Sequence, residues 1–247
     1  KAAYPIHPEL FDRLFNDWSA LDKFQRTRGV LRLMAAVIHH LWERDDRSAM
    51  IMPGSIPIDA GPVQYELTRY LDDPWVPVIE RDIEGVKCLP LQLDQENPNL
   101  GRYAACRRVA RALYLGSAPT LHSANRGLVD QQIKLGCVQP GENVAAFGDA
   151  LRRLTDNATH LYVDGKRYWF STQPSVMRLA QDRANQQTDE DVFEELRKQL
   201  RNDRQRGDFA AVHVAPGSGS DIPDERASRL IILGPELTHS SKDDSSS

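Results

Sequence analysis

Residues 160–170 read His160-Leu-Tyr-Val-Asp-Gly-Lys-Arg-Tyr-Trp-Phe170 and carry the strongest local signal in the chain. Two runs of β-branched and aromatic residues flank the dipeptide Asp164-Gly165. Such a dipeptide favours a type I′ turn, in which both central residues take a positive φ. The sequence therefore predicts a β-hairpin over this stretch.

Three segments with helical periodicity precede the hairpin, at residues 101–115, 125–135 and 140–154. The first predicts a helix that ends at Gly116, because glycine often follows the last turn of a helix. The third begins with Asn143 as its candidate N-cap. One face of the first helix is apolar and another carries four arginines: Arg102, Arg107, Arg108 and Arg111. Three helices followed by a hairpin are the element order of a winged helix-turn-helix.

Cations near the hairpin give this segment a candidate binding surface. In nucleic-acid-binding proteins of this shape, the third helix enters a groove and the wing contacts the backbone. Lys166 and Arg167 follow the hairpin turn, and Arg152 and Arg153 lie near the end of the third helix. These four are the candidate nucleic-acid-binding residues. The alternative is a wing that packs against a neighbouring domain or subunit, because a net charge of −4 provides no global basic field.

Residues 24–42 (FQRTRGVLRLMAAVIHHLW) repeat apolar side chains at spacings of three and four, which predicts a long helix. A helix that starts near Pro8 is expected to pair with it in an antiparallel arrangement. Arg28 and Arg32 lie near the start of the long helix, where cations oppose the helix dipole. A bound anion would offset that cost, whereas two solvated arginines on an exposed face are the simpler alternative.

The chain is expected to have three parts. Residues 1–95 form a helical unit and residues 96–186 the winged helix. Residues 187–247 contain a charged connector helix, two strands of a further unit and a disordered tail. The predicted fold class is therefore mainly α with a β-hairpin wing, combining a helical bundle, a winged helix-turn-helix and the start of an α/β unit.

Composition and missing motifs exclude several classes of protein. Of 247 residues, 40% are hydrophobic and 27% charged, and no apolar run approaches transmembrane length. Cys88, Cys106 and Cys137 are widely spaced without a nearby His pair, which argues against a zinc site and a disulfide framework and favours the cytoplasm. Walker A, HExxH and GxSxG motifs are absent from the sequence. We therefore predict no catalytic residue, no metal ligand and no cofactor for this chain.

Two stretches resemble one known family. Residues 4–14 (YPIHPELFDRL) together with residues 24–42, and residues 159–184 (THLYVDGKRYWFSTQPSVMRLAQDRA), resemble a group of large bacterial and archaeal AAA+ ATPases of unknown function. Relatives of that group occur in phage-defence islands, including BREX-type systems. The resemblance runs from about Tyr4 to Leu230 and so covers most of the chain.

The resemblance implies a lid and a missing core. A P-loop ATPase core that uses ATP and Mg would precede Lys1, and residues 24–42 would belong to the helical lid that follows such a core. Gly29-Val-Leu-Arg32 resembles the GxxR spacing of the sensor-2 helix in AAA+ proteins. Arg32 is therefore the implied nucleotide-sensing residue, with Arg28 and Arg26 as neighbours that could share the role, because a guanidinium offers phosphate a planar fork of donors.

The resemblance thus implies the regulatory and binding portion of a AAA+ ATPase, inactive as an ATPase by itself. Its expected partners are the ATPase core, double-stranded DNA, and another copy of the chain or a defence-system protein, with no membrane. The alternative is a protein-interaction or oligomerisation module that binds no nucleic acid. One exposed patch of the four candidate cations would favour DNA, whereas an exposed patch of Tyr162, Tyr168 and Trp169 would favour a protein partner.

Overall fold

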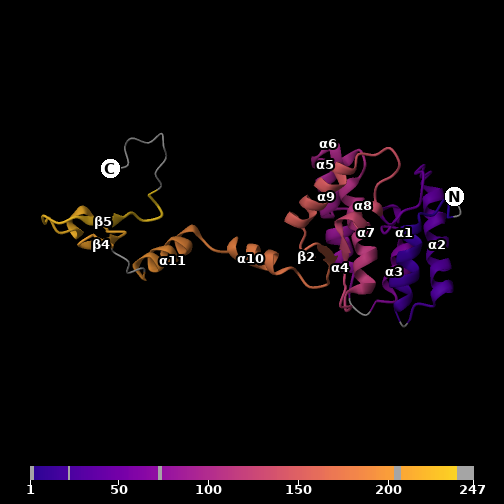
Figure 1. The fold of residues 1–247 in the computed structure, drawn as a ribbon, viewed down its shortest axis with the longest axis horizontal. Helices are drawn as coiled ribbons and strands as arrows, with labels where there is room; N and C mark the ends of the chain where they lie inside the picture. The colour runs from indigo at the N-terminus through magenta and orange to yellow at the C-terminus, as the bar shows by residue number, and fades with distance from the viewer. Residues whose placement is uncertain (1–2, 22, 72–73, 203–206, 238–247) are drawn as a thin grey trace. The chain divides into compact units, whose positions relative to one another are not determined.

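The computed structural model describes residues 3–21, 23–71, 74–202 and 207–237 (Figure 1). The chain is mainly helical, with 54% helix, one three-stranded sheet and one two-stranded sheet, which confirms the predicted mainly α class. It divides into two compact units, Lys1–Arg178 and Leu179–Ser247. The boundary predicted near residue 95 falls inside the first unit, where one hydrophobic core extends from Leu10 to Phe170.

The chain opens with two helical segments, as the sequence predicts. The first is α1 (Pro8–Asp12), continued by a π-helical turn (Arg13–Asp17) and a 3-10 turn (Trp18–Ala20), and the second is α2 (Arg26–Glu43). The four-residue repeat of Leu10, Leu14 and Trp18 places these three side chains in the core. The indole Nε1 of Trp18 donates to the carbonyl of Leu115 at 2.9 Å, so this segment is tied to the centre of the unit.

Short elements connect α2 to the central helix. They are a 3-10 turn (Pro53–Ser55), α3 (Gly61–Thr68), α4 (Val76–Val78) with a π-helical turn (Ile79–Ile83), α5 (Leu89–Glu96) and α6 (Pro98–Gly101). Prolines in the first turns of α3 to α6 suit positions where the backbone N–H has no helical partner.

Helix α7 (Ala105–Ser117) lies at the centre of the first unit (Figure 1) and is buried along most of its length. It runs through Gly116, so the prediction that this glycine ends the helix is wrong. Gly116 is needed for close approach, because an added Cβ would lie 2.5 Å from Cγ of Leu128. A 3-10 turn (Ala118–Thr120) follows the helix.

An antiparallel sheet of three strands lies next to α7. Along the chain follow β1 (Leu128–Val129), α8 (Asp130–Leu135), α9 (Val144–Asn157), β2 (Leu161–Asp164) and β3 (Arg167–Phe170). The strand order is β1-β3-β2, with Leu128 opposite Tyr168 and Leu161 opposite Phe170. Strand β1 replaces the first turn of the helix predicted over 125–135. Asn143 caps α9 as predicted, because its side chain accepts from the N–H of Ala145 at 3.0 Å.

The predicted hairpin is present, with its turn one residue further along the chain. Asp164 is paired with Arg167, which leaves Gly165 and Lys166 as the two-residue loop. Gly165 has a φ of +56° and is the residue of this loop with a positive φ. That pattern fits a type II′ turn, which takes glycine at its first central position, rather than the predicted type I′ turn on Asp164-Gly165.

The remaining elements are two helices and a parallel strand pair. They are α10 (Val176–Ala184), which spans the division between the units, α11 (Asp189–Asn202), β4 (Ala211–Val214) and β5 (Arg229–Ile232), with a 3-10 turn (Gly219–Asp221) between the strands. The predicted disordered tail falls on residues 238–247, outside the described residues. None of the described helices is long and apolar enough to cross a membrane.

Candidate functional site

The β2–β3 hairpin, the predicted wing, carries the two cations that the sequence places there, in different roles. Lys166 is exposed at the hairpin turn. Arg167 donates to the carbonyls of Asn125, Arg126 and Gly127, at 2.9 Å in each case. Arg167 therefore fastens the loop before β1 to the hairpin.

Arg126 is a third cation at the hairpin, and no local sequence pattern predicts its position there. Its guanidinium lies over the ring of Trp169, 4.4 Å from the ring centroid, and the residue is exposed. We call Arg126, Lys166 and Arg167 the basic wing. The position of Arg126 follows from the pairing of β1 with β3, which joins residues about forty positions apart in the sequence. Predicting Arg126 as part of this surface would have required predicting that pairing.

The aromatic residues of the wing are used within the fold. Tyr162 and Trp169 stack with ring centroids 5.7 Å apart, and Trp169 is buried. The hydroxyl of Tyr162 donates to the carbonyl of Pro174 at 2.8 Å, and Tyr168 packs against the core. These contacts do not leave Tyr162, Tyr168 and Trp169 as one exposed aromatic patch.

The two arginines of α9 are neutralised on their own helix. Arg152 donates to Asp149 at 2.6 Å and lies 3.8 Å from Asp156, and Arg153 donates to Asp149 at 3.0 Å. The hydrogen bonds from Arg152 and Arg153 hold the pKa of Asp149 below its ordinary value. Two positive and two negative charges cancel here, so the structure does not join Arg152 and Arg153 to the basic wing as one free cationic patch.

The three implied nucleotide-sensing residues all lie on α2. Arg32 donates to the carboxylate of Glu66 at 2.9 Å, and Glu66 also accepts from Arg69 at 3.1 Å. Arg26 and Arg28 are exposed on the first turn of the same helix. A phosphate contact by Arg32 therefore requires that phosphate replace Glu66 or bind beside it.

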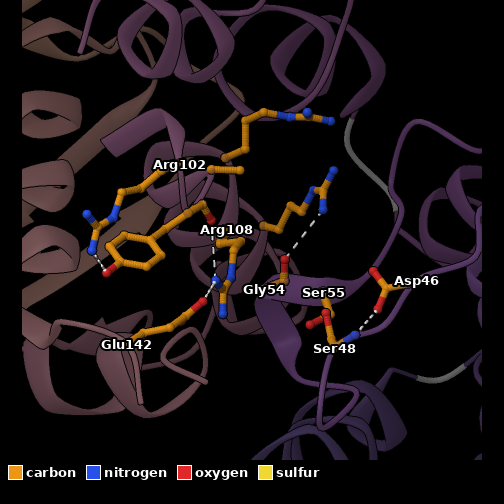
Figure 2. A pocket seen from close by; sticks show the side chains of 11 residues that line it. Asp46, Ser48, Gly54, Ser55, Arg102, Arg108 and Glu142 are labelled. Atoms are coloured by element: carbon orange, nitrogen blue, oxygen red, sulfur yellow. Dashed lines mark hydrogen bonds and ion pairs between the residues drawn. The ribbon is translucent and has the colours of Figure 1, made fainter. Parts of the chain in front are cut away.

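A second concentration of cations surrounds a pocket at the start of α7 (Figure 2). The pocket has a volume of about 260 Å³, and we call it the arginine pocket. Its charged lining residues are Arg102, Arg107, Arg108, Arg111, Asp46 and Glu142. Figure 2 shows Arg108 next to Glu142 on one side, with Ser48, Ser55 and Asp46 on the other. In the sequence the four arginines form one face of a predicted helix, and no pattern there predicts a site for them.

A buried carboxylate holds two of these arginines. Glu84 is 3% exposed and accepts from Arg107 with one oxygen and from Arg111 with the other. The Nε of Arg107 is 3.0 Å from Oε1 of Glu84. One negative charge thus stands between two positive charges, which leaves a local excess of positive charge.

Arg108 is held by a different set of acceptors. It donates to Glu142 at 2.8 Å and to the carbonyls of Tyr103 and Cys137. Arg102 is exposed, and its guanidinium lies over the ring of Tyr103, 4.4 Å from the centroid. The pocket therefore has three fixed guanidiniums and one at its exposed margin.

Asp94 fixes the start of α7 and so the direction of these arginines. Its carboxylate accepts from the N–H of Cys106 at 2.9 Å and of Arg107 at 3.2 Å. Burial raises the pKa of Asp94 above its ordinary value, although these two backbone hydrogen bonds oppose the shift. Because Asp94 occupies two of the backbone donors of this helix end, an anion in the pocket would meet mainly side-chain donors.

The described part of the chain gives little support for a metal site or for a reactive cysteine. No group of three or more His, Cys, Asp or Glu side chains there could hold a metal ion. Cys88, Cys106 and Cys137 are buried and free, and burial raises the pKa of each thiol. Comparisons of the chain with protein-family models, with curated proteins and with solved structures found no match.

Proposed function

We propose that residues 105–170 form a winged helix-turn-helix that binds double-stranded DNA. The observation that carries this proposal is the element order α7-β1-α8-α9-β2-β3, with β1 and β2 both paired to β3. In proteins with this motif, a helix lies in the major groove while neighbouring elements contact the backbone. Helix α9 would take the groove position and the hairpin would be the wing.

The charges favour contact with phosphates over reading of bases. Arg126, Lys166 and Arg167 lie on the hairpin and on the loop that Arg167 fastens to it, whereas the charges of α9 cancel. Phosphate contacts give affinity that depends on salt and carries no direct sequence information. We therefore propose binding that is tolerant of sequence and steeply weakened by salt.

The test is fluorescence anisotropy of a labelled DNA duplex titrated with the chain at several salt concentrations. We expect Lys166→Ala to weaken binding to all duplexes and to lower the salt slope by about one. The matched control is Lys198→Ala, which removes an exposed lysine from α11 and should leave binding unchanged. Absence of binding at low salt, or an equal effect of the two variants, would overturn the proposal.

We further propose that the chain is the regulatory and binding portion of a AAA+ ATPase in the cytoplasm, acting in phage defence. Arg32, with Arg28 and Arg26 beside it, would sense nucleotide held with Mg by a separate ATPase core. What supports this is the sequence resemblance and the common position of the three arginines on α2. The purified chain should hydrolyse ATP no faster than background, and turnover well above background would contradict the assignment.

A protein-interaction or oligomerisation module is the second candidate. It is favoured by three large apolar side chains on the outer face of α2: Leu31 (64% exposed), Ile38 (48%) and Trp42 (85%). Their spacing of seven and four residues places them on one stripe of the helix. If the chain binds no duplex, and light scattering shows a mass above one chain that Trp42→Glu lowers, this candidate replaces DNA binding.

A further inference from the structure

The arginine pocket has a net positive charge in a chain that is negative overall. Its lining contributes four arginines and two acids, Asp46 and Glu142. Adding the buried Glu84 gives four positive and three negative charges, hence one excess positive charge among these seven residues. Asp94 and the Arg44–Asp59 ion pair also lie near Arg107 but do not line the pocket. The whole chain has a net charge of −4. The excess therefore reflects local placement of arginines on one face of α7.

The guanidiniums are held before any ligand arrives. Glu84 is buried and contacts both Arg107 and Arg111, and Arg108 is held by Glu142 and two backbone carbonyls. Side chains that are already ordered lose little conformational entropy when they bind a ligand. The contacts that fix these arginines thus also prepare them to receive an anion.

Donor groups remain on these arginines after the internal contacts are counted. Arg107 uses Nε and Nη2 for Glu84, and no acceptor for its Nη1 is found among the described residues. Arg111 uses Nε for Glu84, and its Nη1 reaches the carbonyl of Gly54 only at 3.5 Å. The hydroxyls of Ser48 and Ser55 lie on the opposite wall. An anion in the pocket would therefore meet donors from two sides.

We propose that the arginine pocket binds a phosphate dianion, either inorganic phosphate or the terminal phosphate of a monoester. Planar guanidinium forks match the geometry of phosphate oxygens, and hydrogen bonds between charged partners are the stronger class. A volume of about 260 Å³ lies just below the range of roughly 300–1,000 Å³ that is usual for small-molecule pockets. That size suits a phosphate group more than a whole nucleotide.

This site is independent of the proposed DNA contact. The pocket is lined by residues between Asp46 and Ser55, by residues between Arg102 and Arg111 and by Glu142, and it shares no residue with the basic wing of Arg126, Lys166 and Arg167. A chain that fails to bind duplex DNA can still bind phosphate, and the reverse also holds.

The test is isothermal titration calorimetry of the full chain with inorganic phosphate in a low-salt chloride buffer. We expect saturable binding that Arg102→Ala weakens at least tenfold. Arg102 suits this purpose because it is exposed and makes its side-chain contacts with the neighbouring Tyr103, so the fold should tolerate its loss. The matched control is Arg152→Ala, which removes an exposed arginine from α9 and should leave phosphate binding unchanged.

Two further measurements sharpen the test. Affinity should rise with pH as phosphate loses its second proton, because the dianion gains more from the arginines than the monoanion. Short single strands with and without a 5′-phosphate distinguish the two sources: preference for the phosphorylated strand over inorganic phosphate indicates a monoester ligand, and no preference indicates free phosphate. Absence of saturable binding, equal loss in Arg102→Ala and Arg152→Ala, or affinity that falls as pH rises would overturn the proposal.

Discussion

Glu84 shows how one residue can organise a charged cluster. It is buried and accepts from both Arg107 and Arg111, which come from a helix more than twenty residues later in the chain. The four arginines could be predicted as one helix face because their spacing is local. Their acid partner could not, because Glu84 lies in a stretch of prolines and acids without clear periodicity and its pairing is set by tertiary packing.

Replacing Glu84 by Gln should cost stability. The change leaves two guanidiniums side by side without their shared carboxylate, and loss of one partner from a buried ion pair costs roughly 3–5 kcal/mol. Urea unfolding followed by circular dichroism measures the effect. Glu80→Gln, at an exposed acid of the same segment, is the control and should stay within about 0.5 kcal/mol of the parent. Equal losses in the two variants would show that Glu84 has no special role.

Asp94 gives a pH dependence with a defined sign. Burial raises its pKa in the folded chain, so the folded state binds the proton more tightly than the unfolded state does. This contribution to stability is complete below about pH 3.9, the ordinary pKa of Asp, and is lost as pH rises through the folded pKa.

The Asp94→Asn variant isolates that contribution because it cannot titrate. The free energy of unfolding of the parent, minus that of the variant, should therefore decrease as pH rises above about 4. Urea unfolding at a series of pH values measures this difference. A difference that grows with pH would mean that the hydrogen bonds from Cys106 and Arg107 outweigh burial in setting the pKa.

At the scale of elements, features set by a short stretch of sequence could be predicted, whereas features set by contacts between distant segments could not. The hairpin and α2 were predicted because their patterns lie within one short stretch of sequence. Strand β1 was missed because it has only two residues and is defined by its pairing with β3, about forty positions later. The role of Gly116 was misassigned for the same reason, since glycine as a helix stop is a local rule whereas its contact with Leu128 is tertiary.

Gly116→Ala tests the contact between α7 and β1. An added Cβ would lie 2.5 Å from Leu128 Cγ, and overpacking of this kind costs about 1–3 kcal/mol. Gly148→Ala is the matched control, because Gly148 also lies within a helix. A Cβ added at Gly148 would have Nζ of Lys134 as its nearest neighbour, at 3.4 Å. That control should be neutral or gain up to about 1 kcal/mol from the better helix propensity of alanine. The comparison uses urea unfolding midpoints, and equal stability of the two variants would contradict the close packing of α7 against β1.

At the scale of the whole molecule, positive charge is concentrated in a few places on a negative chain. The basic wing and the arginine pocket are two such places, and both arise from contacts between segments that are distant in sequence. A net charge of −4 predicts that any polyanion site must be local. The net charge does not indicate where such a site lies. The position of a site depends on which arginines are neutralised by neighbouring acids, as Arg152 and Arg153 are by Asp149.

The most direct test of DNA binding by the winged helix is to titrate a short duplex into the ¹⁵N-labelled chain and follow backbone amide chemical shifts at low salt. We predict that the largest changes occur at the wing, at Gly165 and Lys166, and along the loop that ends at Gly127, with smaller changes at the start of α9. Changes that are absent, or that are confined to residues outside 105–170, would contradict DNA binding by the winged helix.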